Sequence, residues 1–390
     1  MDRRLHAAAL VLAAVHLAAK GADAGEGLPS SPIYGKPFLQ AGGAAVGGYI
    51  DIELLADGDG STFDQHRFVP FIFAEVSDRV HVASEIEFEH GGFVSGGGET
   101  DGEVKIEFAT VDITAAEALN FRGGVILSPL GRLNVLHDAP MLDLTDRPLV
   151  TRHVIPTTLS ESGLGVFGTV YPSELTVLTY ELYAVNGFHG AAVDGGTLNI
   201  RGARGSQKND NNNGRALVGR VGFSPRLGTE IGVSAHTGKY DDAGEHRLTI
   251  AALDARFATG PFEILGEGAL ARAGFAAETE AAGPARTAQE DHDTAKAAGF
   301  YLEARWHFLV GALDALPQSV FTGVVRADYV DRDRNVDGND LERFTLGVNF
   351  RITEETVVKN DLLFDRARSA GSSEWGDTGT GYRFSIASYF

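Results

Sequence analysis

Residues 300–308 read Phe-Tyr-Leu-Glu-Ala-Arg-Trp-His-Phe, so apolar side chains alternate with polar or charged ones. Successive residues of a β-strand point to opposite faces, and this period of two predicts a strand with one apolar face and one polar face. The same pattern recurs in residues 79–90 and 341–352. The sequence therefore predicts a chain built from strands rather than from amphipathic helices.

Sixteen segments of this kind follow one another along the chain. They cover residues 45–54, 66–76, 79–90, 103–113, 119–128, 161–171, 174–186, 215–224, 229–240, 247–258, 262–273, 298–308, 318–330, 341–352, 356–365 and 380–390. Segment 66–76 is apolar on both parities, so its facing is ambiguous. Connections after even-numbered segments are short, for example Pro172-Ser173. Connections after odd-numbered segments are mostly long and polar, for example 91–102 and 187–214.

Tight turns at one end, long loops at the other and an even strand number are typical of a transmembrane antiparallel β-barrel with short periplasmic turns and long external loops. Closure pairs every backbone N–H and C=O group, as hydrocarbon requires, and the apolar parity then contacts outer-membrane lipid. Sixteen strands enclose a wide interior, which we expect to hold water against the polar parity. The alternative is a soluble all-β protein such as a propeller, but no blade-length repeat is visible.

Composition excludes several functions. The 390 residues carry a formal net charge of −20, which disfavours binding to nucleic-acid phosphates. The chain has no Cys, which excludes disulfide scaffolds, thiolate metal sites and Cys nucleophiles. No Gly-x-Ser-x-Gly, His-Glu-x-x-His or phosphate-binding Gly-rich loop is present, so the sequence predicts neither an enzyme nor a cofactor, although a barrel-borne hydrolase remains an alternative.

The N-terminus has the pattern of a secretion signal. Arg3 and Arg4 precede an apolar stretch at 7–19, and Ala22-Asp23-Ala24 fits a cleavage site. We therefore expect a signal peptide at 1–24, a short N-terminal segment at 25–44 and the barrel at 45–390. The alternative is an ordinary amphipathic N-terminal helix.

The last nine residues, 382–390, alternate up to the terminal aromatic Phe390. This stretch resembles the last strand of outer-membrane barrels, which ends in Phe or Trp and is read by the barrel-assembly machinery. The resemblance implies that Phe390 is the assembly signal.

Beyond its terminus, the chain resembles a general porin of Gram-negative outer membranes and, more narrowly, the phosphate-selective-porin-like group. The segments that carry the resemblance are Gly47-Gly48-Tyr49-Ile50-Asp51, residues 84–90, Pro129-Leu130-Gly131-Arg132-Leu133-Asn134, residues 147–150 with 155–158, and Tyr183-Ala184-Val185-Asn186-Gly187. The resemblance implies a homotrimer in the outer membrane that forms a water-filled channel for passive diffusion of ions and small hydrophilic solutes. Two alternatives are a solute-selective channel for phosphate-like anions and a non-channel structural or adhesive barrel.

Residues 129–160 form the third long connection, which is rich in apolar and Pro residues. In general porins the third external loop bends into the barrel and narrows it, so this segment is the constriction-loop candidate. An external cap that packs on a trimer neighbour is the alternative. The charged constriction candidates are Arg132, Asp138, Asp143, Asp146, Arg147 and Arg152.

Charged residues on the polar parity gather in two sectors of the predicted wall. The pore-lining candidates are Glu85, Glu87, Glu89, Lys105 and Glu107 on one side and Arg305, Arg326, Arg343, Lys359 and Arg383 on the other. Facing acidic and basic sectors predict a transverse field across the water column. A structural lattice of ion pairs is the alternative, and the two are compatible.

A weak calcium candidate lies between two late strands. Asp333, Asn335 and Asp337 match the first three ligand positions of a calcium loop, but the residue at its last position is Phe344, where a bidentate Glu is needed. An acidic turn is therefore favoured over a metal site.

Overall fold

The computed structural model describes residues 39–41, 44–91, 102–194, 197–205, 207–275, 294–376 and 378–390. The predicted signal peptide lies outside the described residues. No helix among those residues is long and apolar enough to cross a membrane.

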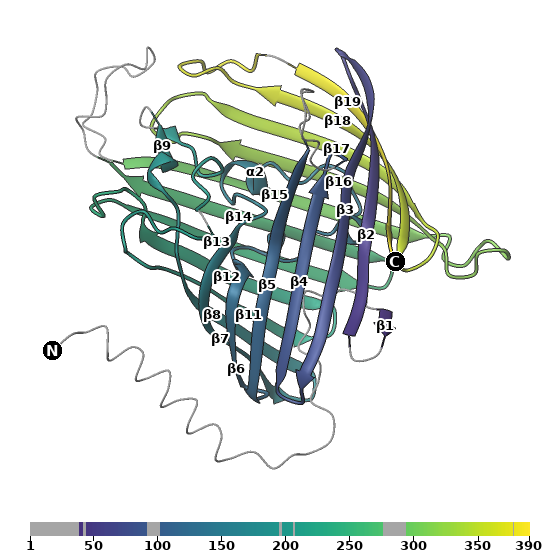
Figure 1. The fold of residues 1–390 in the computed structure, drawn as a ribbon. Coiled ribbons are helices and arrows are strands. Elements are labelled where there is room, and N and C mark those ends of the chain that lie inside the picture. Colours follow the sequence, from purple (N-terminus) through teal and green to yellow (C-terminus); the bar gives the residue numbers. More distant parts are fainter. Residues whose placement is uncertain are drawn as a thin grey trace.

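Sixteen antiparallel strands of the described chain close into a barrel, which confirms the predicted fold class (Figure 1). The strands are β2 (Ala44–Asp57), β3 (Gly60–Ser77), β4 (Val80–Glu89), β5 (Glu103–Ala116), β6 (Leu119–Leu127), β7 (Ser160–Ser173), β8 (Thr176–Val185), β11 (Ala216–Arg226), β12 (Thr229–Lys239), β13 (Arg247–Thr259), β14 (Phe262–Gly274), β15 (Thr294–Phe308), β16 (Val320–Asp331), β17 (Asp340–Arg351), β18 (Thr356–Ala367) and β19 (Thr378–Tyr389). Each predicted strand overlaps one of them. The smaller elements are β1 (Leu39–Ala41), β9 (Val193–Asp194), β10 (Thr197–Leu198), the 3₁₀ helices η1 (Ala139–Met141) and η2 (Gly190–Ala192), and the one-turn helix α2 (Val150–His153).

Strands β2 and β19 close the ring. Their ladder runs from Tyr49 opposite Tyr389 to Ala56 opposite Tyr382. Beyond it, Phe390 N–H donates to Gly48 O at 2.9 Å and Gly48 N–H donates to Phe390 O at 3.2 Å. A Cβ atom on Gly48 would lie 2.6 Å from Phe390 Cζ, so the missing side chain leaves room for the terminal ring.

The two ends of the barrel differ as the sequence predicted. Two-residue turns follow β3, β5, β7, β11 and β13 at the end where β2 begins and β19 finishes. The connection 128–159 and the described residues of the connection 186–215 follow the opposite ends of β6 and β8. The connection between the predicted segments 45–54 and 66–76 is short instead, because β2 and β3 extend to a two-residue turn at Gly58 and Asp59.

The apolar parity faces outward. Phe300, Leu302 and Trp306 are each more than half exposed, whereas Tyr301 and Glu303 between them are buried. The sequence left the facing of segment 66–76 undecided, and the structure resolves it in β3, because Arg67, Val69 and Phe71 are buried and therefore face inward. Six of the exposed aromatic side chains lie near the short-turn end. They are Tyr171, Phe223, Phe257, Phe262, Trp306 and Phe390.

The interior differs from the expected polar, water-filled column. Val185, Val218 and Ile250 belong to the inward parity of their strands and are buried in an apolar cluster with Ile155 and Phe188. The reason is that the two long connections carry apolar side chains of their own, which cover the inward face of the wall here.

Candidate functional site

Residues 128–159, which we call the interior segment, connect β6 to β7 in the chain and lie inside the barrel. Figure 1 shows α2 within the ring of strands. Its apolar residues Leu149, Val150, Val154, Ile155 and Leu159 are buried in the same cluster as the inward side chains of β8 and β11–β14. Burial of such side chains contributes about 1.5–3 kcal/mol each, so this contact holds the segment against the wall.

Backbone groups of the interior segment bind side chains on β12 and β14. Gly131 N–H donates to Ser234 Oγ at 2.8 Å, and the N–H groups of Arg132 and Leu133 donate to Glu267 Oε2 at 3.2 and 3.1 Å. Gly131 has a φ of +72°, and a Cβ atom there would lie 1.8 Å from Glu267 Oε1. The segment enters the barrel through this glycine because a side chain would collide with the acceptor.

Carboxylates of the interior segment pair with the predicted basic sector of the wall. Asp143 contacts Arg305 at 2.9 Å and Arg351 at 3.2 Å. Asp146 contacts Arg343 at 2.6 Å and Arg383 at 3.5 Å. These contacts bring three late strands, β15, β17 and β19, to two carboxylates that lie more than 150 residues earlier in the chain.

Two further predicted residues of this sector are bound in the same region. Lys359 Nζ donates to Ala139 O at 2.9 Å, and Arg326 Nε donates to Asp328 Oδ2 at 2.9 Å. Asp328 also accepts a hydrogen bond from Leu149 N–H at 2.9 Å. The structure therefore presents the basic sector as a lattice of charge pairs.

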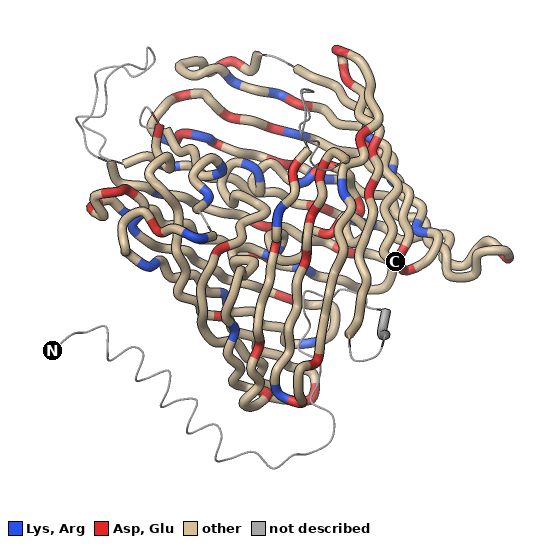
Figure 2. Tube along the Cα trace, in the orientation of Figure 1, with Lys and Arg blue, Asp and Glu red and all other residues tan. Residues whose placement is uncertain are grey.

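The predicted acidic sector lies on β4 and β5, and Figure 2 shows acidic residues along β2–β5. Glu85, Glu87 and Glu107 are fully buried. Glu87 pairs with Lys105 and with Arg67, whose Nε lies 2.6 Å from Glu87 Oε1 and 3.2 Å from Glu89 Oε1. Arg67 is a charged residue of the interior that the sequence did not reveal, because the apolar residues around it hid the parity of β3.

Two further contacts join the interior segment to the wall, one at the acidic sector and one at β19. His137 Nε2 lies 3.0 Å from Glu107 Oε2, and Tyr389 Oη donates to Asp138 Oδ2 at 2.8 Å. Burial lowers the pKa of His137, against the charge of Glu107, which raises it. The predicted constriction residues thus reach different parts of the wall rather than one common point.

Positive charge gathers where the interior segment meets the connection 186–215. Arg201 Nη1 donates to Thr157 O at 2.6 Å, and Arg204 Nη1 donates to Thr158 O at 3.0 Å. Burial, with the charges of Arg332, Arg152 and Arg201, lowers the pKa of His153 to about 4. His153 is therefore neutral at pH 7.

Arg147 and Arg152 differ from the other interior arginines. Nε and Nη2 of Arg147 are buried and lack a hydrogen-bond partner among the described residues, and its Nη1 donates to Thr158 Oγ1 at 3.4 Å. Burial and the charge of Arg67 lower the pKa of Arg147. Arg152 is exposed.

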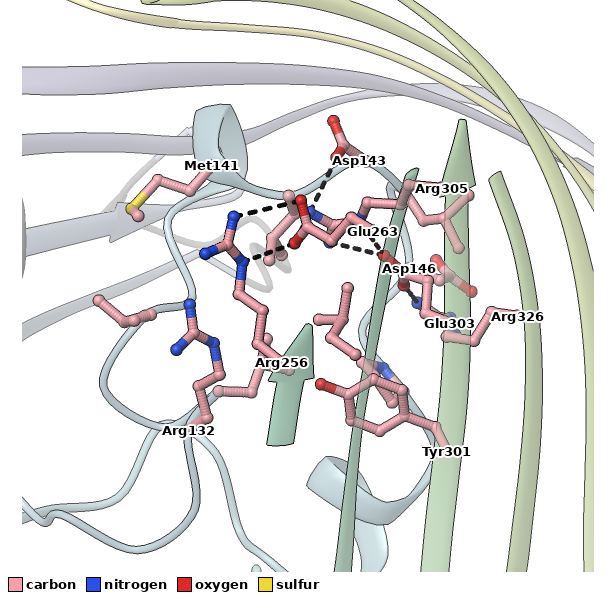
Figure 3. A pocket seen from close by; sticks show the side chains of 16 residues that line it. Arg132, Met141, Asp143, Asp146, Arg256, Glu263, Tyr301, Glu303, Arg305 and Arg326 are labelled. Atoms are coloured by element: carbon pink, nitrogen blue, oxygen red, sulfur yellow. Dashed lines mark hydrogen bonds and ion pairs between the residues drawn. The ribbon is translucent and has the colours of Figure 1, made fainter. Parts of the chain in front are cut away.

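A cavity of about 190 Å³ lies between the interior segment and β13–β16. Figure 3 shows Arg132, Arg256 and Arg305 on its wall together with Asp143 and Glu263. Arg256 Nε donates to Glu263 Oε1 at 2.7 Å, and Arg132 pairs with Glu230. Both signs of charge line this space, which suits dipolar and ionic solutes.

The weak calcium candidate forms an internally bonded turn. Asp333 Oδ1 accepts from Asn335 N–H at 3.1 Å, and Asp333 Oδ2 accepts from Thr197 Oγ1 at 3.2 Å. The Asn335 side-chain amide donates to Thr294 O at 2.6 Å. Asp337 is exposed. Calcium binding here stays a weak prediction.

Comparison with known proteins shows which solved structures share this fold. No family model matches the chain. An uncharacterised protein of Aquifex aeolicus (strain VF5) is 32% identical over 199 residues, which cover 50% of this chain and 43% of that protein. The match thus spans less than half of that relative's length.

Solved outer-membrane proteins share the barrel at low sequence identity. An anion-selective porin from Comamonas acidovorans is 11% identical with a TM-score of 0.58 and covers 89% of this chain and 99% of its own. OmpT of Vibrio cholerae, an outer-membrane protein, is 10% identical with a TM-score of 0.55 and covers 91% and 100%. The outer-membrane channel DcaP of Acinetobacter baumannii is 11% identical with a TM-score of 0.54 and covers 89% and 98%. The chain therefore has the sixteen-stranded fold seen in porins.

Proposed function

We propose that the protein is an outer-membrane porin through which ions and small hydrophilic solutes diffuse passively, and that the interior segment narrows its passage. The observation that carries this proposal is the polar cavity of about 190 Å³ inside a closed barrel whose outer face is apolar. A barrel that served only as an anchor would need no charged cavity behind its wall. In this proposal the chain acts as a channel and not as an enzyme.

The charges of the passage favour anions over cations in this proposal. Asp143 and Asp146 are paired with arginines of the wall, whereas Arg152 is exposed and Arg147 has two nitrogens without a hydrogen-bond partner among the described residues. A charge in a narrow, partly desolvated passage acts on an ion more strongly than one at a wide mouth, where salt screens it within about 8 Å. The second candidate function, a channel for phosphate-like anions, rests on these two arginines.

Single-channel recording in planar bilayers with unequal KCl on the two sides tests both proposals. We expect discrete conductance steps and a reversal potential that reports a preference for chloride. The variant Arg147→Ser/Arg152→Ser removes two positive charges and shifts the reversal potential toward cation selectivity. Conductance block by added phosphate would favour the phosphate-like channel, and correctly inserted protein without conductance steps would contradict the porin.

The matched control is Arg247→Ser/Arg272→Ser. Both arginines are exposed, near the long-connection ends of β13 and β14, so this variant removes the same charge outside the cavity. We expect its reversal potential to equal that of the wild type. Indistinguishable shifts from the two double variants would rule out a special role for Arg147 and Arg152.

Replacing residues 139–153 by a short Gly-Ser linker tests the constriction. The charge pairs of Asp143 and Asp146 and the apolar contacts of α2 are then lost, and we expect a several-fold rise in single-channel conductance. Unchanged conductance in a folded barrel would show that the interior segment does not narrow the passage.

Export and assembly complete the proposal. We propose cleavage of the 1–24 signal, insertion by the barrel-assembly machinery through Phe390, and a homotrimer in the outer membrane. Phe390 supports this role because its backbone closes the ring against Gly48. Phe390→Asp should abolish heat-modifiable barrel in the outer membrane while Phe390→Trp retains it. Equal levels of both variants would contradict the assembly role, and crosslinking of the wild type reports the trimer.

A further inference from the structure

Three potential metal ligands meet on the inner face where β2 pairs with β3, away from the cavity described above. Asp51 and Glu53 are two residues apart on β2, so both point inward. The β2–β3 register shifts between Asp51, opposite Arg67, and Glu53, opposite Asp64, which leaves two residues of β3 facing one residue of β2. Such a bulge re-aims side chains, and here it brings His66 to the inward face beside Arg67.

The ligand atoms of Asp51, Glu53 and His66 all lie within 4.8 Å of one another. His66 Nδ1 is 2.5 Å from Glu53 Oε1 and 3.4 Å from Asp51 Oδ2. Two ligands of a tetrahedral ion with bonds of about 2.1 Å lie roughly 3.4 Å apart. The His66–Asp51 distance already has this value, and the shorter contact needs a displacement of less than one ångström.

A buried oxygen without a partner points to a ligand. Asp51 is 1% exposed, and its Oδ1 has no hydrogen-bond partner among the described residues. A buried carboxylate oxygen left unpaired is costly, and a bound cation would satisfy it.

Charges that face the cluster leave it negative. Arg67 Nη1 lies within hydrogen-bond distance of His66 Nδ1, at 3.4 Å, while Nε and Nη2 of Arg67 donate to Glu87 and Glu89 on β4. Lys359 on β18 faces Asp51 and donates to Ala139 O. His66 is the one basic side chain with an ion-pair contact to Asp51 or Glu53 in the described part of the chain, so two carboxylates share one imidazole.

Neighbouring groups hold the ligands in place. Gln65 Nε2 donates to Asp51 O and Arg67 O, both at 3.2 Å, across the bulge. The His66 ring stacks on His90 with centroids 5.6 Å apart, and His90 Nδ1 lies 2.9 Å from both carboxylate oxygens of Asp64. In known metal sites, contacts of this kind hold the residues that bind the ion in the correct orientation.

We infer that Asp51, Glu53 and His66 bind one divalent transition-metal cation of the zinc class on the inner wall of the barrel. One imidazole nitrogen with carboxylate oxygens suits Zn²⁺ and its neighbours better than Mg²⁺, which prefers oxygen ligands alone. Three protein ligands leave a fourth position open to water or to a small anion. Metal ligands must be deprotonated, so binding of the ion weakens as the pH falls.

Calorimetric titration of the untagged, folded barrel in detergent with ZnCl₂ tests the inference without any channel activity. We expect one ion per chain, and an affinity that falls by about tenfold or more in Asp51→Asn, Glu53→Gln and His66→Gln. The matched control is His236→Gln, because His236 is buried and pairs with one carboxylate, Glu161 at 3.0 Å, but has no third ligand. We expect its affinity to equal that of the wild type.

Two results would overturn the inference. One is equal weakening of Zn²⁺ binding by His66→Gln and His236→Gln, and the other is unchanged binding in His66→Gln. Should a variant fail to fold, wild-type protein loaded with Co²⁺ gives the decision: tetrahedral or five-coordinate absorption bands support the site, and the weak spectrum of hydrated Co²⁺ contradicts it.

Discussion

The two sides of the barrel interior are built differently. On the side of β8 and β11–β14 the inward wall carries an apolar cluster, in which Val218, Leu248 and Ile250 are buried with Ile155 of the interior segment. On the side of β2–β5 and β15–β19 the inward wall is charged and meets the segment through pairs such as Arg343–Asp146.

This difference separates two tasks. Apolar burial is non-directional and favourable in total, so the apolar side holds the interior segment inside the barrel. A buried ion pair gains little net stability because desolvation offsets its attraction, but it fixes the direction and position of each charge. In the proposed porin, the charged side therefore sets which charges a solute meets in the passage.

The largest expected effect comes from breaking the apolar side. Ile155→Asp places an unpaired charge in the buried cluster and should cost the folded protein several kcal/mol. The interior segment should leave the wall, and the single-channel conductance should rise. Urea unfolding and bilayer recording measure the two effects. Ile155→Val is the control, with a cost of about 0.5–1.5 kcal/mol and wild-type conductance. Equal effects of both variants would show that the apolar side does not hold the segment.

A smaller effect is expected from the charged side. Burial raises the pKa of Asp146, the charges of Arg152, Arg343 and Arg383 lower it, and the net direction is downward, so Asp146 is ionised at pH 7. Asp146→Asn leaves Arg343 and Arg383 without this carboxylate. We expect a shift toward anion selectivity in the reversal potential and a stability loss of about 1–3 kcal/mol.

Asp365→Asn is the matched control for this charge. Asp365 pairs with the same Arg343 at 2.6 Å, but its side chain is 43% exposed. Solvent screens such a pair, so we expect a stability loss below about 1 kcal/mol and a smaller change in selectivity. A control that shifts the reversal potential as much as Asp146→Asn would show that the position of the charge does not matter.

The smallest effect concerns pH. His153 has a pKa of about 4 in the folded protein, below the usual value near 6.5, so the unfolded chain binds the proton more tightly. Stability therefore falls as the pH is lowered from about 6.5 to 4, by an amount on the order of 1 kcal/mol from this group. His153→Gln should reduce the acid sensitivity seen in urea unfolding over this window. The same pH dependence in both proteins would contradict the assignment.

The period-two pattern predicted the strands because the outward-facing positions are apolar along most of the chain. It succeeded for β15, where Phe300 and Trp306 face out, and left β3 undecided because Phe68 and Phe71 lie on opposite faces. It also missed the apolar inward positions of β13, since Leu248 and Ile250 are buried by a connection that lies about 90 residues earlier. Periodicity reports the alternation of environments along a strand, not what covers its inner face.

The sequence by itself determined the strand number, the short and long ends and the outward parity, because these depend on residues that are neighbours in the chain. Only the tertiary structure decided which charges meet. Asp146 contacts Arg343 across 197 residues, and His66 reaches Asp51 and Glu53 through a bulge that leaves no mark on the hydrophobic pattern. Ion pairs and metal ligands depend on distances of a few ångströms, which are set by barrel closure and strand register rather than by local sequence.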